Sequence, residues 1–176
     1  MTNLNTDQHL GFTQTYNPRK SVIVLIILNI LTLGIYFPIW AYKHRNWMNS
    51  LNSKLKLKKS VIIAALILII VNVLIVVSSL VAAYILFNTN GASQIYYFIL
   101  SNESLLEGIE VGQDLLSFIL ALLSLNIVFD MRSILNKHFN TKISFLGTLF
   151  FSLFYIQYKI NELTKEKTQS INDTQI

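Results

Sequence analysis

Four carboxylates recur at a spacing that would gather them on one surface. They are Glu103, Glu107, Glu110 and Asp114. Positions i, i+4, i+7 and i+11 share one face of a continuous helix. Such a face would attract divalent cations or a cationic peptide. A solvated helix surface is the plainer interpretation, although like charges stacked without basic partners weaken a helix. The pattern therefore predicts an acidic face as a candidate partner-binding site.

Two amides interrupt long apolar runs at matching depths. Asn29 and Asn72 each lie about 12 residues from the basic stretch between them, which is roughly 18 Å by the helical rise. At one level they would hydrogen-bond across neighbouring helices, an interaction worth about 0.6 kcal/mol inside a membrane. The same pair would also suit a polar permeation path. Asn29 and Asn72 are therefore a candidate interhelical polar pair, and both interpretations stay open.

The residue pattern gives no support for catalysis. The three histidines, His9, His44 and His138, have no partner at metal-ligand spacing, and the chain has no cysteine. Thiolate nucleophiles and cysteine-based zinc sites are therefore excluded. Ser78 and Ser79 lie in an apolar run without a histidine or lysine to activate them. We expect a non-enzymatic protein with no catalytic residues, no metal and no cofactor.

Basic side chains gather beside the apolar segments, and the net charge is +5. For this reason anionic lipid headgroups are nearer partners than nucleic acid. Trp47, Leu51 and Leu55 fall on one helical face among these charges, which favours an interfacial helix. An ordinary cytoplasmic loop that obeys the positive-inside rule is the alternative. The candidate headgroup contacts are Lys43, Arg45, Lys54, Lys56, Lys58 and Lys59.

Composition indicates the class of protein that carries these residues. Of the 176 residues, 53% are hydrophobic and 13% are charged, against about 25% charged in soluble domains. We expect an all-α integral membrane bundle, multi-pass in a bacterial inner (cell) membrane. The apolar segments are 21–42, 60–87, 111–129 and 143–158. Basic loops 43–59 and 130–142 and an acidic outer loop 88–110 separate them. Together these segments and loops form a membrane domain, 21–160, and polar tails 1–20 and 161–176 flank it.

Two motifs carry a resemblance to a known family. The first is T-L-G-I-Y-x-x-x-W-x-Y-K, which begins at Thr32 after an apolar run, and the second is F-Y-I-Q-Y-K-I-N over Phe154–Asn161. Together they resemble an uncharacterised bacterial membrane family, domain of unknown function 4234. Pro38 departs from the pattern expected there. The resemblance implies a small integral membrane protein and carries over no reaction and no catalytic residue.

Topology follows from where lysine and arginine stand. The loop 88–110 contains neither residue type, which marks it as the outer side. We expect four crossings, with both termini outside. If segments 21–42 and 143–158 instead dip in and return, all 14 basic residues are cytoplasmic. Gly34 and Gly147 would permit such breaks. An offset of 116 residues aligns the two motif-bearing segments, which makes them candidate equivalent elements.

The expected function is partner binding or membrane protection. An immunity-like protein would capture a cationic peptide, or bind another membrane protein, at the acidic face. The alternative is a small transporter or channel subunit that uses the level of Asn29 and Asn72 as a polar path. The sequence names no ligand for either role.

Overall fold

The computed structural model describes residues 17–51, 53–88 and 103–173, and within these ranges the chain is entirely helical apart from its connections. The prediction of an all-helical protein is confirmed for this part of the chain. The helices are α1 (Val22–Leu31), α2 (Tyr36–Ser50), α3 (Lys59–Asn88), α5 (Glu103–Phe139) and α6 (Phe145–Asp173).

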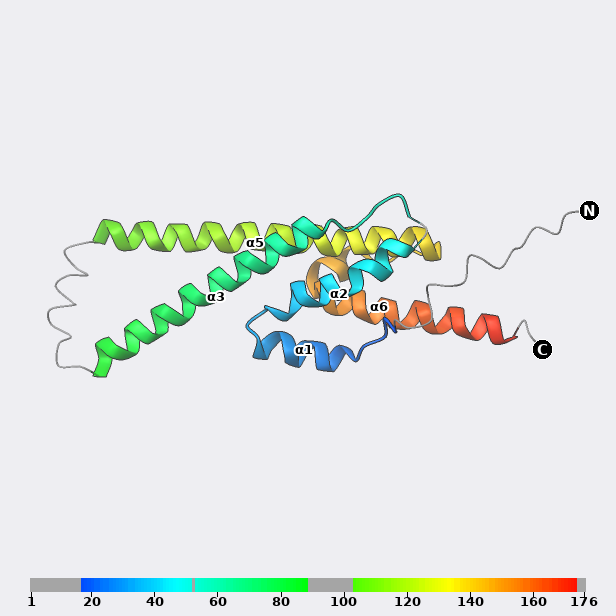
Figure 1. Ribbon diagram of the computed structural model, residues 1–176, viewed down its shortest axis with the longest axis horizontal. Coiled ribbons are helices and arrows are strands. Elements are labelled where there is room, and N and C mark those ends of the chain that lie inside the picture. Colours follow the sequence, from blue (N-terminus) through cyan, green and yellow to red (C-terminus); the bar gives the residue numbers. More distant parts are fainter. Residues whose placement is uncertain (1–16, 52, 89–102, 174–176) are drawn as a thin grey trace, which may run out of the picture.

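Two helices, α3 and α5, are long and apolar enough to cross a membrane. They contain 30 and 37 residues, about 45 and 55 Å by the helical rise. They run antiparallel and splay apart toward the end where α3 finishes and α5 begins (Figure 1). The bounds of α3 lie within one residue of the predicted segment. In contrast, α5 is much longer than predicted and includes most of the expected loop 130–142.

The predicted segment 21–42 is not one helix. α1 ends at Leu31, and the chain turns at Thr32–Ile35 before α2 begins. Leu33 and Gly34 have φ angles of 49° and 88°, a left-handed conformation that ends a helix and that glycine tolerates best. Pro38 lies in the first turn of α2, where a missing N–H leaves no helical bond unmade. The two helices therefore form a hairpin (Figure 1).

The last segment is also interrupted. α6 has a kink at Ser152, where φ is 43° and ψ is −120°. A Cβ on Gly147 would meet the ring of Tyr155 at 2.8 Å. Eight residues span about 12 Å in an unbroken helix, so the chain turns back at Ser152. Beyond the kink, α6 continues as helix to Asp173, through most of the predicted polar tail.

The two interrupted segments share local features at the 116-residue offset. The hydroxyl of Thr32 donates to the carbonyl of Leu28, and that of Thr148 donates to the carbonyl of Ser144, both at 2.7 Å. Tyr42 and Tyr158, also paired by the offset, are about half exposed. Each segment thus has a threonine bonded one turn back, then a break, then an outward-facing tyrosine.

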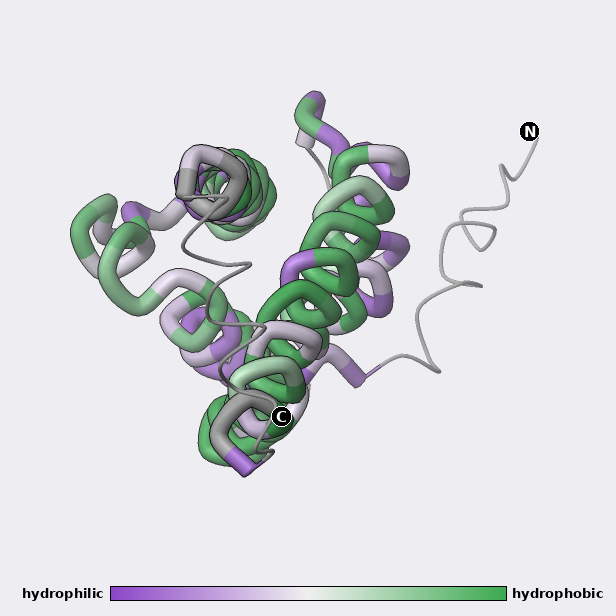
Figure 2. Tube along the Cα trace, turned by 90° about the vertical axis from the view of Figure 1, so that its left-hand side faces the viewer, coloured by the Kyte–Doolittle hydropathy of each residue, from purple (hydrophilic) through white to green (hydrophobic). Residues whose placement is uncertain are grey.

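The packed core lies at one end of the α3–α5 pair. There α2 and α6 pack against the long helices and α1 packs against α2 and α6, and Trp40, Ala65, Met131 and Ile156 are almost fully buried. In contrast, no described residue of α3 after Ala65, or of α5 before Ile127, is buried. Exposed hydrophobic residues instead run along both long helices, and much of the helical trace is hydrophobic (Figure 2).

Candidate functional site

A cavity of about 330 Å³ lies where the long helices begin to splay, and we call it the central cavity. All five described helices or their connections contribute to its wall. The turn between α1 and α2 and the kink of α6 both contribute residues to its lining. The lining residues are Asn29, Gly34, Phe37, Ile69, Asn72, Ser117, Leu120, Ala121, Ser124, Ser152, Leu153 and Phe154.

The structure brings the candidate pair Asn29 and Asn72 to this one cavity. Asn72 donates from Nδ2 to the hydroxyl of Ser117 at 3.0 Å, which links α3 to α5. The Oδ1 atom of Asn29 is buried and has no hydrogen-bond partner among the described residues. A buried acceptor without a partner costs about 1–3 kcal/mol. This oxygen is therefore a place where a donor from outside the chain would be stabilised.

Both breaks of the backbone border the central cavity. A Cβ on Gly34 would lie 2.9 Å from Cδ1 of Ile69, so a residue without a side chain lets the α1–α2 turn approach α3. Ser152 lines the cavity at the residue where α6 turns back. The turn and the kink are thus not peripheral irregularities, because both shape one wall of the site.

The described side chains that line the central cavity are uncharged. The described residues that line it include two amides and three serine hydroxyls, and no aspartate, glutamate, lysine, arginine or histidine. A serine nucleophile needs a neighbouring base, and the lining supplies none. The remaining wall is apolar. The cavity is therefore equipped to hold an uncharged molecule by a few hydrogen bonds and by apolar contact.

The acidic face is exposed on α5. Glu107, Glu110 and Asp114 are exposed on one continuous helix, whereas the side chain of Glu103 lies outside the described residues. No group of three acidic or histidine side chains in the described residues is placed to hold a metal ion. The first part of the predicted outer loop, 89–102, is likewise outside the described residues.

Several of the basic residues that were predicted to contact lipid headgroups instead contact other residues of the protein. Arg45 donates from Nε to the carbonyl of Leu57 at 3.0 Å, and Lys56 donates from Nζ to the carbonyl of Asn49 at 2.6 Å. Lys59 lies 5.8 Å from the ring centroid of Tyr42. Lys43, Lys54 and Lys58 are exposed. α2 ends at Ser50, so the predicted interfacial helix stops before Leu51 and Leu55.

A buried polar network joins both motif-bearing segments to the chain before α1. Trp40 donates from Nε1 to Oε1 of Gln157 at 2.8 Å, and Gln157 donates from Nε2 to the carbonyl of Pro18 at 3.0 Å and to Oδ1 of Asn161 at 2.8 Å. Nε2 of His44 lies 3.2 Å from the same Pro18 carbonyl. The tryptophan and glutamine of the two family-like motifs therefore have a structural role.

Sequence reasoning missed this network, because Gln157 and Trp40 are 117 positions apart. One local signal was present: Trp40 and His44 stand at i and i+4 on one helical face. Burial lowers the pKa of His44, and repulsion from the ammonium groups of Lys20 and Lys43 acts in the same direction. Bonds to the carbonyls of Trp40 and Pro18 oppose the change. The buried ring is therefore favoured in its neutral form.

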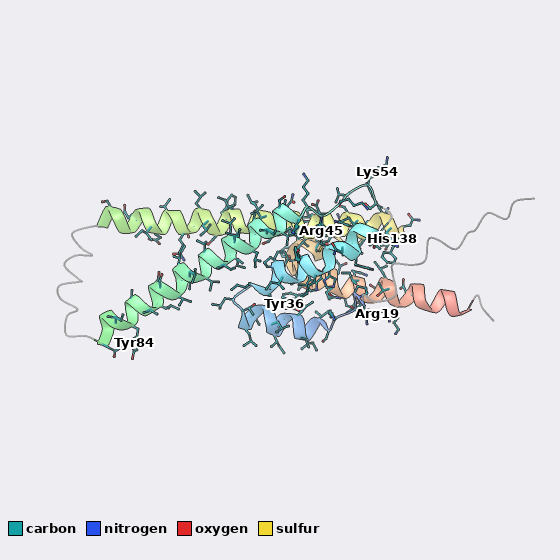
Figure 3. The ribbon with its side chains drawn as sticks, in the orientation of Figure 1. Arg19, Tyr36, Arg45, Lys54, Tyr84 and His138 are labelled. Carbon is teal, nitrogen blue, oxygen red and sulfur yellow. The ribbon has the colours of Figure 1, made fainter. Side chains whose placement is uncertain are left out.

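Basic residues gather at the end of the molecule opposite the end of α3 near Asn88. Figure 3 shows Arg19, Arg45, Lys54 and His138 in the half of the molecule opposite Tyr84. Arg19 donates from Nε to the hydroxyl of Thr164 in α6 at 3.0 Å, which holds the chain before α1 beside the last helix.

Comparison with protein-family models, curated proteins and solved structures gave no match to this chain. The resemblance to domain of unknown function 4234 therefore stays a prediction based on the two motifs.

Proposed function

We propose that this protein is a small, non-enzymatic membrane protein that binds an uncharged molecule within the bilayer, as a small transporter or channel subunit does. One observation carries the proposal: the two backbone breaks and the Asn72–Ser117 pair meet at the central cavity. Interrupted apolar segments in corresponding positions of a chain are a typical sign of a binding site in membrane transporters.

The level of the cavity agrees with this role. Asn72 lies 13 residues after Lys59, the first residue of α3, which is about 20 Å along the helix. A bilayer core is about 30 Å thick, so a tilted α3 would carry Asn72 near its middle. Irregular backbone is tolerated at such depth where protein covers it or where it borders a water-filled cavity. A water-filled central cavity would meet that condition for both breaks.

The proposed topology has two crossings, α3 and α5. The hairpin of α1 and α2, and α6 with its kink, enter from the basic side and turn back. Contacts at that side support this arrangement, because the residues before α1 bond to α2 and to α6: Pro18 to His44, and Arg19 to Thr164. All 14 lysines and arginines would then be cytoplasmic, in agreement with the positive-inside rule.

Single cysteines test the topology, because the natural chain has none. They would be placed at Thr6, Ser53, Ser93, Ser133 and Ser170 and treated with an impermeant thiol reagent in intact cells. Two crossings predict labelling at residue 93 alone, and labelling at all five after the cells are permeabilised. Labelling at residues 6 and 170 in intact cells would contradict the proposal and support four crossings.

A second pair of cysteines tests the cavity. Ser124 lines it, whereas Leu122 lies two residues away on α5, does not line it and is 52% exposed. A maleimide reacts with a thiolate, which forms in water and not in hydrocarbon. We expect Ser124→Cys to be labelled in membranes and Leu122→Cys to stay unlabelled. Absence of labelling at both would mean that the cavity is closed to water and to small solutes.

The acidic face supports a second candidate function. Glu107, Glu110 and Asp114 are exposed together, so a cationic peptide would find three carboxylates on one helix face. Replacing Glu107 and Glu110 with glutamine should weaken the binding of such a peptide and leave labelling of Ser124→Cys unchanged. Replacing Asn72 with leucine should have the opposite effects.

A further inference from the structure

A groove of about 300 Å³ opens beside the α1–α2 hairpin, separate from the central cavity. It is lined by Tyr36, Trp40, Lys43 and His44, which stand at i, i+4, i+7 and i+8 on one face of α2, and by Lys20 from the chain before α1. We call it the lysine groove. The buried network around Trp40 and His44 forms its floor, so its shape depends on the packed core.

The lysine groove carries positive charge without a counter-charge. Among the described residues, its lining contains two lysines and no acidic residue. Within the described residues, neither Lys20 nor Lys43 forms an ion pair, in contrast to Lys159, which is paired with Glu162. Both ammonium groups repel a proton from the buried ring of His44, which lines the groove with them, so both charges act on the groove. Two positive charges that line one groove favour an anion there.

The surroundings indicate which kind of anion. The outer face of α1 is apolar and exposed at Ile23, Ile27 and Ile30, by 69%, 50% and 67%. Lys20 precedes this face, at the end where the basic residues gather. Tyr36 precedes Lys43 by seven residues on α2, about 10 Å by the helical rise, so this aromatic residue lies toward the other end of the groove, with Trp40 between them. Charge at one end and rings at the other match a phospholipid, whose phosphate lies at the headgroup level and whose chains lie deeper.

We propose that the lysine groove binds a phosphate group between Lys20 and Lys43, supplied by an anionic phospholipid of the cytoplasmic leaflet. This site does not depend on the occupant of the central cavity. A bound phosphate would neutralise the local field of the two lysines, and the buried His44 beside them would then hold its proton more readily. The ring of His44 is therefore a reporter of occupancy in the unaltered protein.

The first experiment follows the ring titration of His44 by NMR in three kinds of nanodisc. They contain phosphatidylcholine alone, phosphatidylcholine with inorganic phosphate in the buffer, or phosphatidylcholine with phosphatidylglycerol. Substitution of His9 and His138 assigns the signal. We expect the His44 pKa to rise with phosphatidylglycerol and to stay unchanged with inorganic phosphate. An equal rise with inorganic phosphate would overturn the lipid as the source. No rise in any nanodisc would overturn the phosphate site itself.

The second experiment measures bound phosphatidylglycerol by native mass spectrometry. The double variant Lys20→Gln with Lys43→Gln is compared with Lys142→Gln with Lys165→Gln, which removes the same charge at exposed residues outside the groove. Each basic residue near an anionic surface contributes about fivefold to affinity, so we expect roughly thirtyfold weaker binding in the groove variant alone. Equal loss in both variants would mean that the charges act only as a general field, and would overturn the groove.

Discussion

The two ends of the α3–α5 pair have similar apolar sequences and opposite packing. At the end where α3 begins and α5 finishes, which we call the basic end, Ile62 and Ala65 of α3 and Val128 of α5 are almost fully buried. At the splayed end, Leu80 and Tyr84 of α3 are 65% and 71% exposed. The difference lies in what covers them, since α2 and α6 pack against the long helices, and no described residue at the splayed end is buried. Apolar composition thus selects helices suited to a membrane, whereas local coverage decides which part of them forms a core.

The largest difference in the free energy of unfolding is expected between the variants Trp40→Ala and Tyr84→Ala. Trp40 is 1% exposed and bonds to Gln157. Truncation of a buried aromatic residue typically lowers the free energy of unfolding by about 3–5 kcal/mol. Tyr84, at 71% exposure, should change it by less than about 0.5 kcal/mol. Denaturation in detergent measures both, and equal losses would show that the splayed end is also packed.

A smaller contrast is expected between two glycines. Gly34 has a φ of 88° and a Cβ there would lie 2.9 Å from Ile69, so Gly34→Ala should destabilise the fold by about 1–2 kcal/mol. A Cβ on Gly108, in α5 at the splayed end, would have no atom of the described residues within 4 Å. Gly108→Ala should stabilise the helix by up to about 1 kcal/mol. The same denaturation assay applies, and a stabilising Gly34→Ala would contradict the described turn.

Protonation of His44 at low pH should destabilise the packing at the basic end of the molecule. Burial holds the folded-state pKa of His44 below the ordinary 6.5. The neutral ring therefore contributes to the free energy of unfolding above pH 6.5. That contribution is lost as the pH falls through the folded-state pKa. Thermal denaturation at pH 7.5 and 5.5 measures the loss. His44→Asn should reduce the difference between the two pH values, whereas His138→Asn should preserve it. An unchanged pH dependence in His44→Asn would exclude this origin.

The smallest effect is expected where the packed and splayed regions meet. Asn72 and Ser117 form the hydrogen bond at the edge of the central cavity. A double-mutant cycle with Asn72→Leu and Ser117→Ala should give a coupling of about 0.6 kcal/mol, the average for such bonds in membranes. A coupling near zero would mean that the pair is held open, with each group solvated in the cavity.

The sequence predicted some elements well, for identifiable reasons. A 28-residue apolar run without lysine or arginine has one stable form in lipid, a helix, so α3 lies within one residue of its prediction. The segment 21–42 was harder, because its length also fits one crossing. Leu33 and Gly34 adopt left-handed angles there, and the pattern of apolar letters does not record backbone angles. Ser152 breaks α6 although its residue type gives no such signal.

The sequence by itself determined the helical class, the long apolar helix α3 and the segregation of charge. These properties follow from composition and helical rise, which are local. The tertiary structure decided that Asn29 and Asn72 share a cavity, that Gln157 bonds to Trp40, and that Lys20 joins Lys43 in one groove. Each of these depends on where the chain reverses. Reversal at Gly34 and Ser152 reflects packing against α3 and α5, a non-local balance that residue spacing does not encode.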